Sequence, residues 1–474
     1  MKKKLTFHGI RLFKTAVIAA GVVTGALLVA GFGCTPPVSS PVDGNNVVLA
    51  VSGMNSPFRI AVDEYAAQDS DADAQLLSDL IGNRFCAAIE KVKGNELTSG
   101  DKYIVAFGAP EVPECAALQA ELKANEYAVR ISRREDSGAI IVSIAYKSGA
   151  ARKCVIDRLM KEFCPKGAER FAIPDGTDIR GSVDPASLFI TTGVSLRDPC
   201  VLVENGTYYM YGTKWVYYKN TSGRLDGEWE GPFDCVQEKP VDSDKEYWAP
   251  EVHKYNGKHY MFTTYHSTAN DHRGCVILCA DTPEGPFEMI SSGHVTPGDW
   301  DCIDGTLYID GSGKPWMALV HEWTCTADNV GRMAVAPMSG DLTKLSGTPK
   351  DIFGAKDAPW ATGNITDGPW LYTCENGTLL MLWSNFDAAG YSVGMARSKN
   401  GRIDGQWEQL PYQLFSKSFS GAFDGGHCMI FTDTDGQMYM SLHSPNSKTG
   451  DRKTLAVFVP VREESGLLIW DIYK

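Results

Sequence analysis

Basic residues are in short supply in this chain of 474 residues. Lys and Arg total 45 against 58 Asp and Glu, which gives a formal net charge of −13. The first 33 residues contain basic residues but no acidic one, so the rest of the chain is more acidic still. Nucleic acids and anionic membrane surfaces attract Lys and Arg, and the composition therefore argues against both as partners.

Paired cysteine motifs with the spacing of a structural zinc site are also missing. Thirteen Cys are present, and twelve remain after Cys34, which belongs to the N-terminal segment. An even number in an exported chain permits disulfides. Several of them, such as Cys275 and Cys279, fall in predicted strands, where Cys can be a small buried apolar residue. The sequence leaves both alternatives open.

The N-terminus has the composition of a targeting signal. A basic stretch precedes an apolar run over 15–33, which ends at Cys34. Small residues before a Cys are similar to a bacterial lipoprotein signal, which predicts a signal peptide over 1–33 and a lipid on Cys34 as the only membrane anchor. The alternative is an uncleaved anchor, since roughly 20 apolar residues span a bilayer. Either one places the protein in the cell envelope, on the periplasmic or cell-surface side of a bacterial membrane.

Two regions with different periodicity follow. Residues 34–46 are rich in Pro, Ser and Gly and predict a tether. Over 47–185 apolar residues recur at helical spacing in 74–92, from Pro113 toward Ala124, and in 155–163, between short apolar strands. A hairpin is predicted around 136–138. This part predicts a small α/β accessory domain without a catalytic constellation.

Helical periodicity is nearly absent from 187–474, where five polar residues recur at similar spacing. They are Asp198, Glu251, Asp304, Asp367 and His427, separated by 53, 53, 63 and 60 residues. Each opens an apolar strand followed by a turn and an aromatic-rich strand. A repeat of this length predicts an all-β five-bladed propeller, in which the first strand of each blade lines a central funnel. The five side chains are then expected in one pit.

The motifs around these residues resemble family 43 of the glycoside hydrolases, five-bladed propeller enzymes that include arabinanases and β-xylosidases. They are Arg197-Asp198-Pro199, Trp248-Ala249-Pro250-Glu251, Asp304-Gly305-Thr306-Leu307, Asp367-Gly368-Pro369-Trp370 and Gly425-Gly426-His427. The resemblance covers the C-terminal 60% of the chain, in the order of the family. It implies a carbohydrate substrate with arabinofuranosyl, xylosyl or galactosyl linkages and no organic cofactor.

The resemblance also implies roles. Asp198 matches the general base and Asp304 the residue that raises the pKa of the acid. The acid of the family is a Glu in a Glu-Gly-Pro motif, and Asp367 stands there instead. An inverting glycosidase needs one ionised and one protonated carboxyl about 6.5–9.5 Å apart. This separation leaves room for the water that the ionised carboxyl activates. Either Asp367 is the acid, or Glu251 takes that role, or hydrolysis is lost.

Further residues are expected around the funnel. His427 is expected on the propeller axis, where the resemblance implies a calcium ion held through water or an orienting contact with the base. Sugar rings stack on aromatic side chains, and core packing is the alternative for each aromatic residue. The expected substrate contacts are Trp248, Trp323, Trp360, Trp370, Phe386, Arg397 and His321.

The sequence therefore predicts a lipid-anchored, inverting glycosidase, which we expect to be a monomer. A glycan-binding surface lipoprotein that keeps the pocket without turnover is the main alternative. A purely structural propeller would give no reason for a carboxylate at the inner strand of four blades.

Overall fold

The computed structural model describes residues 38–446 and 453–473, which belong to one compact unit. The predicted signal peptide, 1–33, and Cys34 lie outside the described residues. Within the described part of the chain, no helix is long and apolar enough to cross a bilayer.

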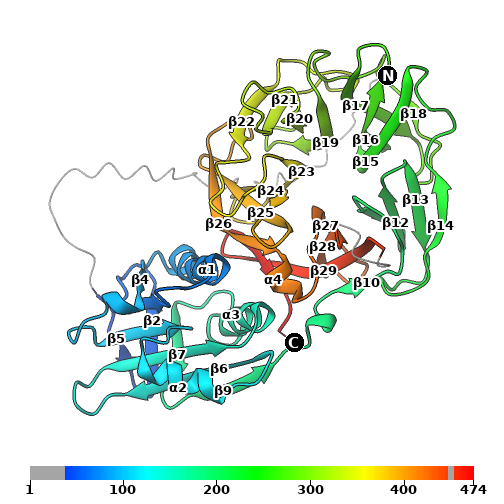
Figure 1. Cartoon of the computed structure of the whole chain (residues 1–474). Helices are drawn as coiled ribbons and strands as arrows, with labels where there is room; N and C mark the ends of the chain where they lie inside the picture. Colours follow the sequence, from blue (N-terminus) through cyan, green and yellow to red (C-terminus); the bar gives the residue numbers. More distant parts are fainter. Residues whose placement is uncertain (1–37, 447–452, 474) are drawn as a thin grey trace, which may run out of the picture. The chain divides into compact units, whose positions relative to one another are not determined.

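The first part of the described chain combines two sheets with three helices (Figure 1). A three-stranded sheet has the order β1-β2-β8, and a six-stranded mixed sheet has the order β4-β3-β5-β7-β6-β9. The hairpin predicted around 136–138 is confirmed, since β6 and β7 pair antiparallel. The strands are β1 (Val42–Asp43), β2 (Asn46–Val51), β3 (Arg59–Val62), β4 (Glu90–Lys93), β5 (Tyr103–Phe107), β6 (Glu126–Arg133), β7 (Ile140–Tyr146), β8 (Arg170–Pro174) and β9 (Asp178–Ser182).

Two sequence-based boundaries are wrong in this part. The helix expected over 74–92 is α1 (Gln68–Phe85), because Cys86 has a left-handed backbone with φ 51° and ends it. Burial then alternates from Phe85 to Glu90, the period of a strand, and β4 follows. The tether expected over 34–46 is partly folded, since β1 pairs with β2. The other helices are α2 (Pro113–Glu121) and α3 (Gly149–Phe163), close to their predicted positions.

Five antiparallel sheets make up the rest of the chain (Figure 1). Sheet 1 contains β11 (Cys200–Glu204), β12 (Thr207–Gly212), β13 (Val216–Asn220) and β14 (Glu230–Asp234). Sheet 2 contains β15 (Ser243–Tyr255), β16 (Lys258–Ser267), β17 (His272–Ala280) and β18 (Glu288–Met289). Sheet 3 contains β19 (Cys302–Ile309), β20 (Pro315–His321), β21 (Arg332–Pro337) and β22 (Lys350–Gly354). Sheet 4 contains β23 (Asp367–Thr373), β24 (Leu379–Phe386), β25 (Tyr391–Ser398) and β26 (Trp407–Phe415).

Sheet 5 is built from both ends of this region. It contains β27 (Gly426–Thr432), β28 (Met438–Ser444) and β29 (Leu455–Glu464), and β30 (Leu467–Trp470) also pairs with β29. Its outer strand is β10 (Ile190–Thr191), which precedes sheet 1 in the chain and pairs antiparallel with β29. The short helix α4 (Lys417–Ser420) lies between sheets 4 and 5 in the sequence. The start and the end of the region are thus joined in one sheet.

The sheets follow one another in a closed order. The first strand of each sheet contacts the first strand of the next, and β27 contacts β11. Each neighbouring pair, including sheets 5 and 1, shares a buried apolar cluster. The second strands β16 and β20 are buried along almost their whole length. This arrangement brings the starts of five strands to one place.

The twelve cysteines from Cys86 to Cys428 are unpaired, and most of them are buried. Of the two alternatives left open by the sequence, the structure therefore favours small buried residues over disulfides.

Candidate active site

In each of sheets 1 to 5, a residue in left-handed backbone lies just before the first strand, near its start or, in β15, in its middle. The φ angle is 57° at Asp198, 41° at Ala249, 54° at Asp304, 51° at Gly368 and 54° at His427. In sheets 2 to 5 the strand pairing shifts register at the same point. Such bulges re-aim side chains and occur next to active sites. These four bulges, together with the left-handed backbone at Asp198, direct neighbouring side chains into a common space.

That space is a pocket of about 330 Å³. It is large enough for a small saccharide unit. Three carboxylates at the starts of first strands line it, and a fourth, Glu322, comes from the end of β20. The full lining is Arg197, Asp198, Thr213, Trp248, Ile303, Asp304, Val320, Glu322, Trp323, Ile365, Thr366, Asp367, Tyr391 and His427.

Asp198 is buried among groups that favour its ionised form. The hydroxyl of Thr213 donates to Oδ2, while Oδ1 lies 3.4 Å from His427 Nδ1 and 3.2 Å from His443 Nδ1. Burial alone would raise the pKa of Asp198, but the charge of His427 and the hydrogen bond with His443 outweigh it and hold the pKa well below its usual range. Asp198 is therefore a carboxylate over the whole physiological range.

Asp304 and Asp367 have raised pKa values, unlike Asp198. Burial raises the pKa of Asp304 to about 6, against the lowering effects of His427 and of the Gly368 N–H, which donates to Oδ2 at 3.0 Å. Burial and the charge of Asp304 raise the pKa of Asp367 to about 7, and a hydrogen bond from Tyr391 to its Oδ2 at 2.8 Å partly opposes this. Near neutral pH Asp367 therefore carries a proton part of the time, while Asp304 is mostly ionised and Asp198 is fully ionised.

Comparison with known proteins places this pocket in a family. The model of the glycosyl hydrolases family 43 matches residues 189–463, more than half of the chain. The chain belongs to this family. It is therefore a glycosidase, as the motifs predicted, and the match begins after the α/β part.

Solved structures support the same assignment. An endo-arabinase from Bacteroides thetaiotaomicron is 35% identical, over 58% of this chain and 98% of its own, with a TM-score of 0.52. A thermostable family-43 glycoside hydrolase is 24% identical, over 60% of this chain and 96% of its own, with a TM-score of 0.53, and shares the fold. No curated protein matches the chain.

Glu251 does not line the pocket of this family 43 member, contrary to its expected role as an alternative acid. Its side chain is buried, with Oε2 at 3.2 Å from His253 Nε2. The nearest left-handed residue of its strand is Ala249, two positions earlier, whereas Asp198, just before β11, and Asp304, in β19, are themselves left-handed. This offset explains why Glu251 has a different environment from the two Asp.

The aromatic wall is smaller than expected, because only Trp248 and Trp323 of the predicted aromatic residues line the pocket. Trp360 is buried in the core, where its ring lies 5.0 Å from that of Trp383. Trp370 stacks on His253 with ring centroids 5.6 Å apart.

Phe386, His321 and Arg397 also lie outside the pocket lining. The ring of Phe386 packs on Tyr391, with centroids 5.2 Å apart. His321 stacks on Trp300 at 3.6 Å, and Arg397 forms an ion pair with Glu408 at 2.9 Å. Each side chain packs on or pairs with a neighbour, and none of the three lines the pocket, so their contacts with a substrate stay a prediction.

Several site residues escaped the sequence-based prediction. Tyr391, Thr213 and Thr366 line the pocket, and His443 contacts Asp198 from behind. They come from second and third strands or from loops, so the repeat of first-strand residues could not find them. Glu322 belongs to the segment His321-Glu322-Trp323, which the sequence offers as a candidate rim of the pocket, although no role was predicted for its carboxyl.

The residues around His427 offer a calcium ion few ligands. Its Nδ1 lies 3.4 Å from Asp198 Oδ1 and 3.7 Å from Asp304 Oδ2, while the buried Nε2 and the buried Oε1 of Glu251 have no partner among the described residues. Calcium takes six to eight oxygen ligands. The described ranges contain no group of three His, Cys, Asp or Glu placed to hold a metal. Direct coordination by side chains does not fit, and an ion here would have to be held through water.

Proposed function

We propose that this protein cleaves glycosidic bonds of arabinan-type or xylan-type polysaccharides or oligosaccharides, by a single displacement that inverts the anomeric carbon. Asp198 is the general base. Asp304 raises the proton affinity of its neighbours. The motif position assigns the proton donor to Asp367, and Glu322 is a further carboxyl with a raised pKa in the same pocket.

One observation carries this proposal. A carboxylate that stays ionised and two carboxyls whose pKa values are raised to about 7, Asp367 and Glu322, line one pocket of about 330 Å³. Hydrolysis with inversion requires both states at once, because one group activates water while another protonates the leaving oxygen. The substrate class is supported by the endo-arabinase that is 35% identical, and galactosyl linkages belong in the same test.

The surroundings of the site are part of the proposal. Residues 187–474 would form a five-bladed propeller with the pocket on its axis, and 47–185 an α/β accessory domain. The N-terminal signal supports a lipid on Cys34 that tethers the protein at the cell envelope, and we propose that the protein is a monomer. A calcium ion would be held near His427 through water, where it would add positive charge near the carboxylates.

The first test is a panel of substrates. The purified protein is incubated with linear arabinan, xylan and aryl glycosides of arabinofuranose, xylose and galactose, and the release of reducing sugar or phenol is measured. Proton NMR of the first product should show the inverted anomer. Binding without release across the panel would contradict the proposal and favour a glycan-binding protein. The reason to consider that alternative is Asp367, which is one methylene shorter than the Glu of the family motif.

The pH profile is a further prediction. We expect kcat/KM to be highest on the acid side and to fall about tenfold for each pH unit above about 7. Asp198 remains ionised throughout, so the base does not limit activity. The pKa values of Asp367 and Glu322 are both raised to about 7, and the proton donor is lost as the pH rises through this value. Initial rates on an aryl glycoside measure the profile, and activity that keeps rising at alkaline pH would contradict it.

A further inference from the structure

Glu322 is part of the wall of the pocket, and its pKa is raised, whereas that of Asp198 is lowered. It follows β20 directly, and its side chain is 12% exposed. It lines the same pocket as Asp198, Asp304 and Asp367. A carboxyl in this position can reach a bound sugar, and this inference rests on the proposed glycosidase activity.

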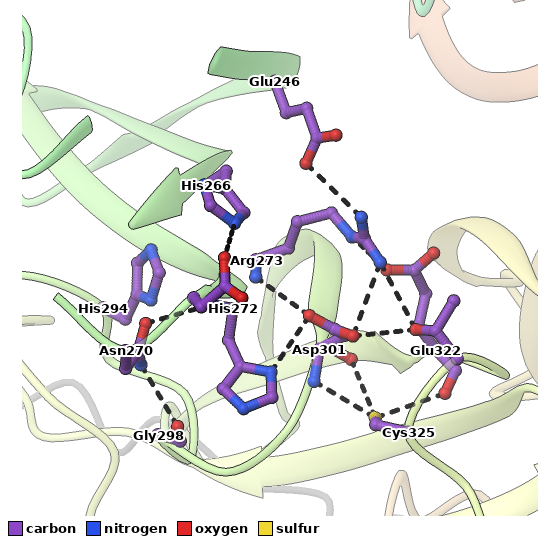
Figure 2. Close-up of polar contacts among 12 residues, drawn as sticks. Glu246, His266, Asn270, His272, Arg273, His294, Gly298, Asp301, Glu322 and Cys325 are labelled. Atoms are coloured by element: carbon purple, nitrogen blue, oxygen red, sulfur yellow. Dashed lines mark hydrogen bonds and ion pairs between the residues drawn. The ribbon is translucent and has the colours of Figure 1, made fainter. Parts of the chain in front are cut away.

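One cation holds Glu322 and two other acids. Figure 2 shows Arg273 of β17 between Glu246, Asp301 and Glu322. Its Nε lies 2.5 Å from Glu322 Oε2, while Nη1 lies 3.4 Å from Glu246 Oε2 and Nη2 3.4 Å from Asp301 Oδ2. The three carboxylates together carry more negative charge than Arg273 can neutralise. The cluster therefore fixes the orientation of Glu322 and still favours the uptake of a proton.

The two oxygens of Glu322 differ in their surroundings. Oε2 accepts the hydrogen bond from Arg273, and Oε1 has no hydrogen-bond partner within 38–446 and 453–473. The guanidinium also lies over the ring of Trp248, 5.9 Å from its centroid, and Trp248 lines the pocket. One oxygen is thus anchored while the other is available to a substrate.

The protonation state supports a donor role. Burial raises the pKa of Glu322 to about 7. Arg273 lowers it, and the charges of Asp301 and Asp367 raise it. These groups face Glu322 from sheets 2 and 4 and from the loop before β19. A general acid works best when its pKa lies near the working pH.

Asp367 is less suited to deliver the proton. It is one methylene shorter than the Glu of the family motif, and a donor has to come within about 2.6–3.2 Å of the leaving oxygen. Its Oδ2 accepts a hydrogen bond from Tyr391 at 2.8 Å, and the charge of Asp304 makes Asp367 hold its proton more tightly. We propose that Glu322 protonates the leaving oxygen, while Asp304 and Asp367 line the pocket around the sugar.

In the proposed hydrolysis, the water oxygen bonds to the anomeric carbon. The bond from that carbon to the leaving oxygen breaks, and its electron pair stays on that oxygen. Glu322 gives its proton to that oxygen, and Asp198 takes a proton from the water. The products are a hemiacetal of inverted configuration and an alcohol. Exchange with solvent then returns Glu322 to the acid and Asp198 to the carboxylate.

The test compares Glu322→Gln with Asp367→Asn on leaving groups of different quality. An acid catalyst matters for a poor leaving group and little for one that departs unprotonated. For Glu322→Gln we expect kcat/KM to fall roughly 10²–10⁴-fold on a phenyl glycoside but less than about tenfold on the dinitrophenyl glycoside, with the alkaline limb of the pH profile removed. Glu228→Gln, at an exposed position outside the pocket lining, is the matched control.

The outcomes separate the proposals. Equal losses on both substrates for Glu322→Gln, with the selective loss in Asp367→Asn, would overturn the role of Glu322 and leave the glycosidase intact. If the wild-type protein releases no sugar from any substrate, the proposed function fails and the role of Glu322 fails with it. Circular dichroism of each variant verifies folding.

A second measurement tests the cluster around Glu322. Replacing Asp301 by Asn removes a negative charge, which should lower the pKa of Glu322 and move the alkaline limb to lower pH. Replacing Arg273 by Gln removes the positive charge and should move the same limb to higher pH. Shifts of opposite sign support the donor assignment, and a limb that neither variant moves contradicts it.

Discussion

Replacing Asp198 by Asn should lower kcat/KM by roughly 10²–10⁴-fold on every substrate that the wild-type protein cleaves. Asn has the size of Asp but cannot take a proton from water. Because the base acts on the attacking water and not on the leaving group, the loss should be equal for phenyl and dinitrophenyl glycosides. This pattern differs from the one expected for Glu322→Gln.

The control for this prediction is Asp435→Asn, an exposed Asp outside the pocket lining, which should retain activity. Binding of an oligosaccharide to Asp198→Asn, measured by calorimetry, should persist, since the variant keeps the shape of the pocket. Activity within about tenfold of wild type would show that another group activates the water. Loss of binding together with activity would assign Asp198 to the structure of the pocket rather than to the base.

The contrast between Asp198 and its neighbours is electrostatic. Asp198 lies beside two imidazoles, which stabilise its negative charge. Asp367 instead experiences the negative charge of Asp304, which raises its pKa. The pKa of His427 is itself raised, because Asp304 and Asp198 outweigh the effect of burial. Neighbouring charges of opposite and like sign thus separate carboxyls of the same type into a base and proton carriers.

The repeat of first-strand residues could be predicted from the sequence because it follows the period of the sheets. Asp198, Asp304, Asp367 and His427 meet in one pocket, as expected from spacing alone. The resemblance of the motifs also predicted the family, which the match over 189–463 confirms. What spacing cannot provide is the position of each residue within a bulge.

Glu251 illustrates this limit. Asp198 and Asp304 are themselves left-handed residues, Asp367 stands one position before the left-handed Gly368, and Glu251 stands two positions after the left-handed Ala249. An offset of one or two residues is invisible among gaps of 53 to 63 residues, and the irregular pairing at the bulges breaks the simple alternation of faces along the strand.

The aromatic residues could not be sorted either. Trp360 and Trp370 lie close in sequence to Asp367, yet one packs on Trp383 and the other stacks on His253. Large apolar rings serve both cores and sugar platforms, and only the burial of each ring distinguishes them. Glu322 and Arg273 come from different sheets, so their pairing depends on tertiary structure that a single sequence does not reveal.

A second large effect is expected in the α/β part, where Asp73 of α1 is buried against two cations of α3. Its Oδ2 lies 2.6 Å from Arg152 Nε, and Oδ1 lies 3.0 Å from Lys153 Nζ, with all three side chains almost fully buried. Asp73→Ala leaves Lys153 buried without its partner, which should destabilise the protein by about 3–5 kcal/mol. The measurement is unfolding by urea or heat, with hydrogen exchange in α1 and α3 as the probe of the α/β part.

Asp71→Ala provides the matched control on the same helix. Asp71 pairs with Lys91 and Lys93, but its side chain is 31% exposed, so its loss should cost only about 0–1 kcal/mol. Replacing Asp73 by Leu together with Lys153 by Met should recover much of the stability, because it removes the uncompensated charge and fills the same volume. Equal effects of Asp73→Ala and Asp71→Ala would show that the burial of these charges does not govern the stability of the α/β part. Our interpretation of the α1–α3 contact would then be wrong.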